Sequence, residues 1–210
     1  TAGLGVYIWG AQFTESAKPL PYVKTLDVAV TKTFAETLRT EYDAVTGKNL
    51  GALIEGGSTN TMVRSEDFDN ASWTKTRCSI VANDAIAPDG TLSADKMTAT
   101  LADARLEQLS GSTGVAYTQS IWVKAASAST VACQLDFSGL NINAFTATSE
   151  WQRFDTTHTE LTQAGRVRLR ILNSGDSVYV WGAQLEVEPF VTSYIRTEGS
   201  AVSRSRDNLH

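Results

Sequence analysis

The sequence predicts an all-β fold, a jelly-roll β-sandwich, from three observations. Short apolar or alternating runs recur between residues 50 and 186, and turn residues such as Gly, Pro, Asn and Asp separate them. Alanine, serine and threonine are abundant, which favours strands and loops over long helices. The length of 210 residues with 42% apolar residues suits one sandwich domain plus extra segments.

The expected strands follow one another and are separated by turns and loops. Residues 28–42 fit a strand or a helical period equally well, and residues 42–48 suit a tight turn with a positive φ. Residues 50–54 form a short apolar strand, and residues 67–73 a loop with two large aromatic side chains. Further strands are expected at 94–99, 105–109, 116–125, 131–137, 151–157, 165–172 and 177–186, with a turn at 87–91.

An internal repeat divides the chain. Residues 6–13 (VYIWGAQF) reappear as residues 178–185 (VYVWGAQL), and the same offset also matches two later segments, 22–25 with 194–197 and 29–33 with 201–205. We interpret residues 1–33 as the last strand and exit segment of a preceding repeat plus a linker, and residues 34–210 as a complete domain. The alternative is a single domain that uses two similar strands.

The extra strand near the N-terminus should therefore need a partner. Since an unpaired strand edge is a template for pairing, we expect residues 1–25 to add to the sheet of the complete domain or to pair with another copy of the chain. The segment lacks the charged and apolar regions of a secretory signal. Tandem repeats and a homo-oligomer are the assemblies that this pattern favours.

Charge and composition exclude several function classes. A net charge of −5 argues against nucleic acid as a partner, which needs a concentrated basic face. No run of eighteen apolar residues exists, so no membrane-spanning helix is expected. The two cysteines, Cys78 and Cys133, each lie in a strand-like run; we expect buried, reduced thiols, with a disulfide as the alternative.

The chain shows no catalytic constellation. His158 and His210 are its only histidines, and neither has a second histidine at a metal-binding spacing. There is no nucleophile elbow and no phosphate-binding glycine loop. Carboxylates for glycoside hydrolysis, such as Asp136 and Glu150, are common in any acidic chain. The sequence predicts a protein that is not an enzyme, with a polysaccharide-degrading enzyme as the minor alternative.

Several short motifs occur in a fixed order between residues 40 and 205. They are Leu53-Ile54-Glu55 with Thr59-Asn60, Ser65-Glu66-Asp67-Phe68 with Trp73, APDGT at 87–91, YTQSIWVKA at 117–125, WQR at 151–153 and VYVWGAQLE at 178–186. Together they resemble the jelly-roll carbohydrate-binding domains of phage tail and virion proteins. More distantly, they resemble the carbohydrate-binding modules appended to glycoside hydrolases.

The resemblance implies a function and a setting. It implies a non-catalytic, adhesin-like module of a tandem-repeat phage or surface protein, located on a virion or an extracellular appendage. Its partner would be a cell-surface or environmental polysaccharide, together with the neighbouring repeat. A structural or oligomerising spacer module of a phage tail fibre is the alternative, because the internal repeat supports it equally well.

Strand alternation places the sugar-binding candidates. Recognition of a sugar requires an aromatic face and fixed polar groups. In residues 120–125, Ile121 and Val123 should face the core, which leaves Trp122 and Lys124 outside. Trp122 is expected either to contact the ligand or to cover a sheet edge. Tyr179 and Trp181 share one face of their strand, and the sequence does not decide which face is the core.

The same alternation adds polar candidates. Gln134 and Asp136 should face outward in residues 131–137, and Arg168 should do so in residues 165–172. These three side chains would join Trp122 and Lys124 in one site if their strands are neighbours. An outward row of arginines suits either a solvated face or an anionic polysaccharide.

The remaining candidates are two further tryptophans and a pair of acidic residues that could bind calcium. Trp73 should cap the end of the sandwich or line a groove, and it is the further carbohydrate-binding candidate; Trp151 should belong to the core. Modules appended to glycoside hydrolases often hold a structural calcium between an acidic residue near the first strand and an aspartate on the last. Glu66 and Asp67 match the first position, whereas the last strand has no aspartate there. The resemblance therefore implies no required cofactor, with calcium at Glu66 and Asp67 as an expectation.

Overall fold

The computed structural model describes residues 40–42, 49–158 and 164–207. The chain divides into two compact units, residues 1–53 and residues 54–210. In the first unit, the described part is an antiparallel hairpin of β1 (Thr40–Tyr42) and β2 (Asn49–Ala52). The strand expected within residues 1–25 lies outside the described residues, as does all of the linker that the sequence places before residue 34.

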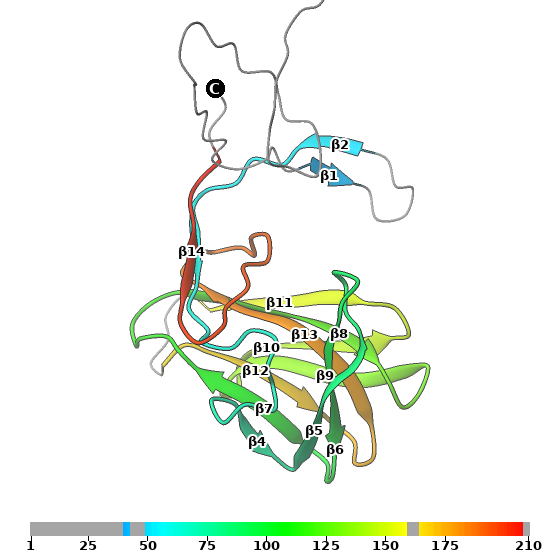
Figure 1. The fold of residues 1–210 in the computed structure, drawn as a ribbon. Helices are drawn as coiled ribbons and strands as arrows, with labels where there is room; N and C mark the ends of the chain where they lie inside the picture. The colour runs from blue at the N-terminus through cyan, green and yellow to red at the C-terminus, as the bar shows by residue number, and fades with distance from the viewer. Residues whose placement is uncertain (1–39, 43–48, 159–163, 208–210) are drawn as a thin grey trace, which may run out of the picture. The chain divides into compact units, whose positions relative to one another are not determined.

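The second unit is a sandwich of two five-stranded antiparallel sheets, which confirms the predicted all-β fold (Figure 1). We name the sheets after their central strands. The β12 sheet has the order β10 (Leu140–Thr148), β9 (Thr130–Phe137), β12 (Arg166–Ile171), β7 (Ala104–Leu109) and β4 (Thr74–Thr76). The β13 sheet has the order β11 (Gln152–His158), β8 (Tyr117–Ala125), β13 (Ser177–Glu186), β6 (Leu92–Ala99) and β5 (Cys78–Ile86).

The core lies between the two sheets and follows the two-residue period of the strands. Ile121 and Val123 of β8 are fully buried, as are Val178 and Val180 of β13, while the residues between them face outward. Burial of each such side chain contributes about 1.5–3 kcal/mol to folding. No described helix is long and apolar enough to cross a membrane.

Side chains close one edge of the sandwich, where β10 lies beside β11. Asn141 and Asn143 of β10 donate from their side chains to backbone carbonyls of β11 at 2.6 Å, which ties the two sheets together. Phe145 and Phe154 stack between the same strands with ring centroids 3.7 Å apart. Both cysteines are free thiols; Cys133 is buried, as expected, whereas Cys78 is only half-buried. Burial raises the pKa of Cys133 to about 12, so that side chain acts as a small apolar group.

A bulge in β13 explains the glycine of the repeated motif. The register of β13 against β8 shifts between Trp181 and Gln184, and Gly182 within the bulge has a φ of +64°. A Cβ at Gly182 would lie 3.1 Å from the Trp122 ring. Glycine is therefore required both by the backbone conformation and by the close approach of the indole.

The side chain of Asn60 holds together the two segments by which the chain enters and leaves the sandwich. It lies at the end of β3 (Ser58–Asn60), which pairs with β14 (Val202–Arg204). The buried Asn60 side chain donates to the carbonyls of Ala183 and Ile195 and accepts from the backbone amide of Leu185 at 3.1 Å. This single amide joins β3, β13 and the segment that follows β13.

Candidate functional site

The outer face of the β13 sheet carries a row of alternating aromatic and cationic side chains. Tyr179 of β13 is the direct cross-strand partner of Lys124 on β8 and of Lys96 on β6. Neighbouring strands lie about 4.8 Å apart, so the three side chains stand next to one another. Trp151 immediately precedes β11, whose first residue pairs with Val123 of β8, and its ring packs in the same cluster as Trp122. We call Trp151, Lys124, Tyr179, Lys96 and Trp122 the aromatic face.

Tyr179 is the member of this face with no visible structural role. It is partly exposed and belongs to neither of the two apolar clusters of the described unit. Its hydroxyl makes no hydrogen bond to any described residue. Lys96 and Lys124 likewise have no ion-pair or hydrogen-bond partner among the described residues. Three neighbouring polar or amphipathic side chains are therefore free to meet a ligand.

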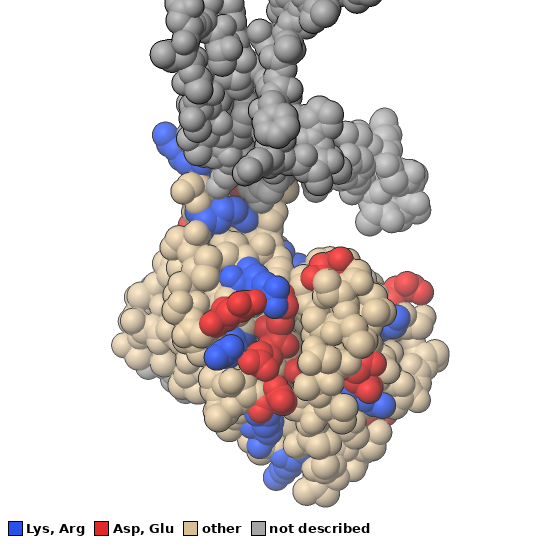
Figure 2. All heavy atoms as spheres, in the orientation of Figure 1, with Lys and Arg blue, Asp and Glu red and all other residues tan. Residues whose placement is uncertain are grey.

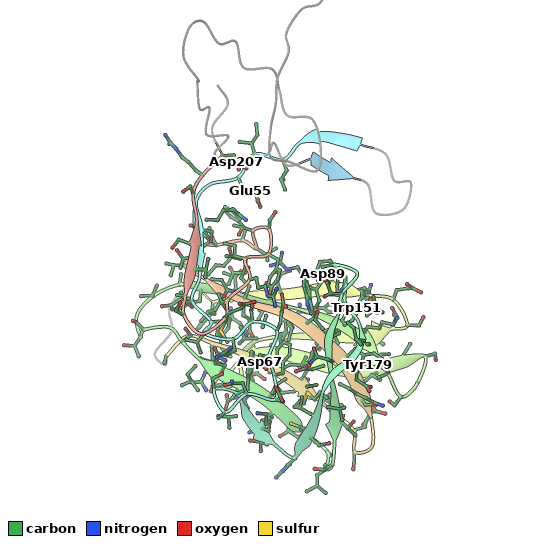
Figure 3. The ribbon with its side chains drawn as sticks, viewed as in Figure 1. Glu55, Asp67, Asp89, Trp151, Tyr179 and Asp207 are labelled. Carbon is green, nitrogen blue, oxygen red and sulfur yellow. The ribbon has the colours of Figure 1, made fainter. Side chains whose placement is uncertain are left out.

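A small apolar cluster outside the main core supports the face. Trp122 and Trp151 pack with Trp181, Ala94 and Tyr194, and the rings of Trp181 and Tyr194 lie 4.6 Å apart. The indole of Trp151 donates to the carbonyl of Ile86 at 3.0 Å, which fixes the ring against the β5–β6 hairpin. Trp151 and Tyr179 are labelled in Figure 3; β8 lies between the strand of Tyr179 and the strand that follows Trp151.

The structure confirms some of the predicted positions and corrects others. Trp122 and Lys124 face outward, as the alternation predicted. The prediction that Trp151 belongs to the core is wrong. It is half-buried on the outer face, because it has the same strand parity as Arg153, the cross-strand partner of Trp122. Tyr179 lies on the outer face as well. The alternation already placed it with Trp181, but burial was needed to choose the side.

Trp73 cannot bind a ligand in this conformation. Its side chain is only 2% exposed and packs on Phe68 with ring centroids 4.8 Å apart. Its indole nitrogen donates to the carbonyl of Arg64 at 2.9 Å. Of the two roles expected for it, Trp73 has the structural one: it caps the end of the core.

The predicted grouping of Gln134, Asp136 and Arg168 with Trp122 is wrong. Those three residues lie on β9 and β12, which belong to the β12 sheet, whereas Trp122 lies on β8 of the β13 sheet. All of these side chains face outward from a sandwich, so the two groups lie on opposite faces. The condition that their strands be neighbours is not met.

On the β12 sheet, the arginine row is neutralised by acidic residues. Arg168 and Arg170 each approach the fully buried carboxylate of Asp136 at 3.4 Å. Arg170 also pairs with Asp103, and Arg166 pairs with Glu107 at 3.2 Å. Because each guanidinium already has a carboxylate partner, this face does not present an uncompensated basic row to an anionic polysaccharide.

A polar pocket of about 270 Å³ opens between the 64–67 loop, the β5–β6 hairpin and residues 196–198. Acidic side chains form a strip across this part of the surface, with basic side chains at its borders (Figure 2), and Asp67 is labelled there in Figure 3. Asp95 lies in the pocket wall with 2% exposure and accepts hydrogen bonds from the amides of Phe68 and Asn83 at 2.9 and 2.8 Å. Burial, reinforced by nearby acidic residues, raises the pKa of Asp95 to about 6.

Glu66 and Asp67, the expected calcium ligands, line the same pocket, where other side chains already engage both carboxylates. Glu66 accepts a hydrogen bond from the Tyr194 hydroxyl at 2.8 Å and pairs with Arg196 at 3.1 Å, while Asp67 pairs with Arg64 at 3.4 Å. Burial raises the pKa of both carboxyls. Within the described part of the chain, no three acidic, histidine or cysteine side chains converge as ligands of one ion.

Comparisons with known proteins add a fold likeness. No family model and no curated protein matches the sequence. Among solved structures, the fold resembles carbohydrate-binding modules and a phage tailspike domain. The CBM22-1 xylan-binding domain from Paenibacillus barcinonensis is 14% identical with a TM-score of 0.47, and the match covers 65% of this chain and 99% of that one.

Two longer chains are similar over a part of their length. The enzymatically active domain of tailspike protein 4 of bacteriophage CBA120 is 14% identical with a TM-score of 0.42, and the match covers 60% of this chain and 21% of that one. A Clostridium thermocellum xylanase fragment with CBM22-1 and GH10 modules, complexed with xylohexaose, is 15% identical with a TM-score of 0.44, over 68% of this chain and 30% of that one. At these values the likeness concerns the fold alone.

Proposed function

We propose that the unit of residues 54–210 is a non-catalytic, polysaccharide-binding module that holds a glycan on the aromatic face. The observation that carries this proposal is Tyr179: an aromatic side chain on a sheet surface, flanked by two unpaired lysines and used by no packing cluster. A pyranose presents an apolar C–H side, which stacks on an aromatic ring, and hydroxyls, which accept hydrogen bonds from ammonium groups.

The shape of the face suits a chain of sugars. The row crosses three strands through Lys96, Tyr179 and Lys124, and the indoles of Trp122 and Trp151 lie in the apolar cluster of the same outer face. An open sheet surface leaves bound sugars partly hydrated, and the affinity of one module should be modest. Among the described residues, His158 packs on Phe137 with ring centroids 6.0 Å apart.

We propose further that the module belongs to a tandem-repeat phage or other extracellular surface protein. The support is the internal repeat, in which residues 6–13 match β13 residue by residue, including the glycine of the bulge. Tandem modules would raise the overall affinity through avidity. A spacer of a tail fibre is the second candidate, since the same repeat favours it. A trimeric fragment that retains no glycan would support the spacer.

Retention by polysaccharides tests the binding function. The full chain should be retarded in native gels that contain one of a panel of soluble xylan, glucan, mannan, galactan and bacterial capsular polysaccharides. Tyr179→Ala should abolish the retardation. Gln134→Ala, on the outer face of the opposite sheet, is the matched control and should migrate like the unmodified chain. Loss of retardation in Gln134→Ala but not in Tyr179→Ala would move the site to the β12 sheet, and no retardation by any polysaccharide would overturn the proposal.

A further inference from the structure

The polar pocket beside the β5–β6 hairpin has features of a built binding site. Four carboxylates line it, but only two guanidinium groups, Arg64 and Arg196, are there to balance them. Thr197, which lines the pocket too, is 3% exposed, and its Oγ1 is buried without a hydrogen-bond partner. A buried hydroxyl without a partner destabilises a fold unless something else satisfies it.

We propose that this pocket binds a single neutral sugar residue, the end or a branch of a glycan. The proposal rests on the carbohydrate-binding function and adds a second, separate site to it. The excess of carboxylates disfavours uronates, sulfates and phosphates, because a further anion would meet Asp95, Glu66 and Glu198. A polyol suits the lining instead: its hydroxyls donate to the carboxylates and accept from Thr197 and the guanidinium groups.

The dimensions and surroundings of the pocket agree with such a ligand. At about 270 Å³ it is smaller than the roughly 300–1,000 Å³ typical of pockets for drug-sized ligands, so it admits one sugar ring and not a chain. Its wall is shared with the apolar cluster under the aromatic face. Ser93, in the lining, accepts from the Trp181 indole at 3.1 Å, and Glu66 accepts from Tyr194, whose ring packs on Trp181.

The test measures binding of methyl glycosides to the full chain by amide chemical-shift mapping. The probes are the methyl glycosides of glucose, galactose, mannose, xylose and rhamnose, with methyl glucuronide and calcium chloride as charged competitors. One neutral glycoside should shift the amides of Asn83, Asp95 and Thr197. Thr197→Val, which keeps the shape of the side chain and removes only the hydroxyl, should weaken that binding about three- to tenfold without lowering the melting temperature. Thr197→Ser should bind like the unmodified chain.

Several outcomes would overturn the inference. They are an absence of shifts at these amides with every neutral glycoside, stronger binding of glucuronide or calcium than of the glycosides, or an unchanged affinity in Thr197→Val. If Thr197→Val does not fold, Arg196→Gln decides, because the Arg196 side chain is 60% exposed and its loss should weaken the same shifts. Retardation by a polysaccharide that Tyr179→Ala abolishes, with no glycoside in the pocket, would refute this site and leave the aromatic face in place.

Discussion

Tyr179 of β13 and Lys124 of β8 are direct cross-strand partners on the outer face of the β13 sheet. The side chains of both residues are free of hydrogen bonds to described residues. On a sheet surface, such neighbours contribute at most about 1 kcal/mol to stability through their mutual contact. This pair can therefore be changed with little effect on the fold, which makes the aromatic face suitable for mutational tests.

Trp122 and Tyr179 should differ in what their removal does. Trp122→Ala removes an indole that packs in the Trp181–Tyr194 cluster and against Gly182, so it should lower the free energy of unfolding by about 1–3 kcal/mol as well as weaken glycan retention. Tyr179→Ala should change stability by less than about 0.5 kcal/mol. Urea denaturation of both variants measures the difference. Equal destabilisation of the two would show that Tyr179 has a packing role.

Trp73→Ala should be strongly destabilising and should leave the glycan site intact. The variant loses a buried side chain and leaves the Arg64 carbonyl without its indole donor, at a cost of about 3–5 kcal/mol. Trp73→Phe keeps an aromatic ring but not the indole N–H. Its denaturant midpoint should lie between those of the unmodified chain and Trp73→Ala. Retention of polysaccharide by the folded fraction of Trp73→Ala should match that of the unmodified chain. A stable Trp73→Ala variant that fails to bind polysaccharide would show that Trp73 belongs to the glycan-binding site.

The buried carboxyl of Asp95 should make stability depend on pH in a predictable direction. Its folded pKa of about 6 lies above the ordinary aspartate value of 3.8, so the folded state binds more protons between these pH values. Its contribution to stability is therefore most favourable below about pH 4 and is lost as the pH rises through 6, by up to about 3 kcal/mol. Glu66 and Asp67, whose pKa values are also raised, act in the same direction.

Asp95→Asn isolates that contribution, because other carboxyls titrate in both proteins. The pKa of Asp103 is lowered: burial acts against this, but Arg105 and Arg170 outweigh it. The stability that Asp103 contributes to the fold is therefore lost on acidification in both proteins. Urea titrations at pH 7.5, 6.0 and 5.0 should show the unmodified chain gaining stability relative to Asp95→Asn as the pH falls. A difference that is constant with pH would show that Asp95 does not titrate in this range.

Calcium should leave the melting temperature unchanged. Glu66 and Asp67 are held by Tyr194, Arg196 and Arg64, and no third acidic ligand converges with them among the described side chains. A ligand of the native state must raise stability, so melting in millimolar calcium and in chelator should agree within about 1 °C. A clear rise in calcium would mean that the carboxylates rearrange around the ion, and Glu66→Gln should then abolish that rise.

The period of the strands was enough to predict much of this protein from its sequence. Because successive side chains on a strand alternate between faces, the sequence of β8 alone placed Ile121 and Val123 in the core and Trp122 and Lys124 outside. The ordered motifs indicated the sandwich fold. The repeat of residues 6–13 in β13 is likewise a property of the sequence, and its consequence for residues 1–33 stays a prediction.

Only the tertiary structure decided which outward side chains meet. Gln134 and Arg168 have the right strand parity but belong to the sheet opposite Trp122, since hydrogen bonding between distant segments sets sheet membership and local sequence does not. Loop residues have no alternation to follow. Trp73 was therefore placed in the core only once its loop path was known, and the side of the sheet that Trp151 takes followed only from the pairing of Arg153 with Trp122. The pocket around Asp95 and Thr197 exists because three segments far apart in sequence meet there.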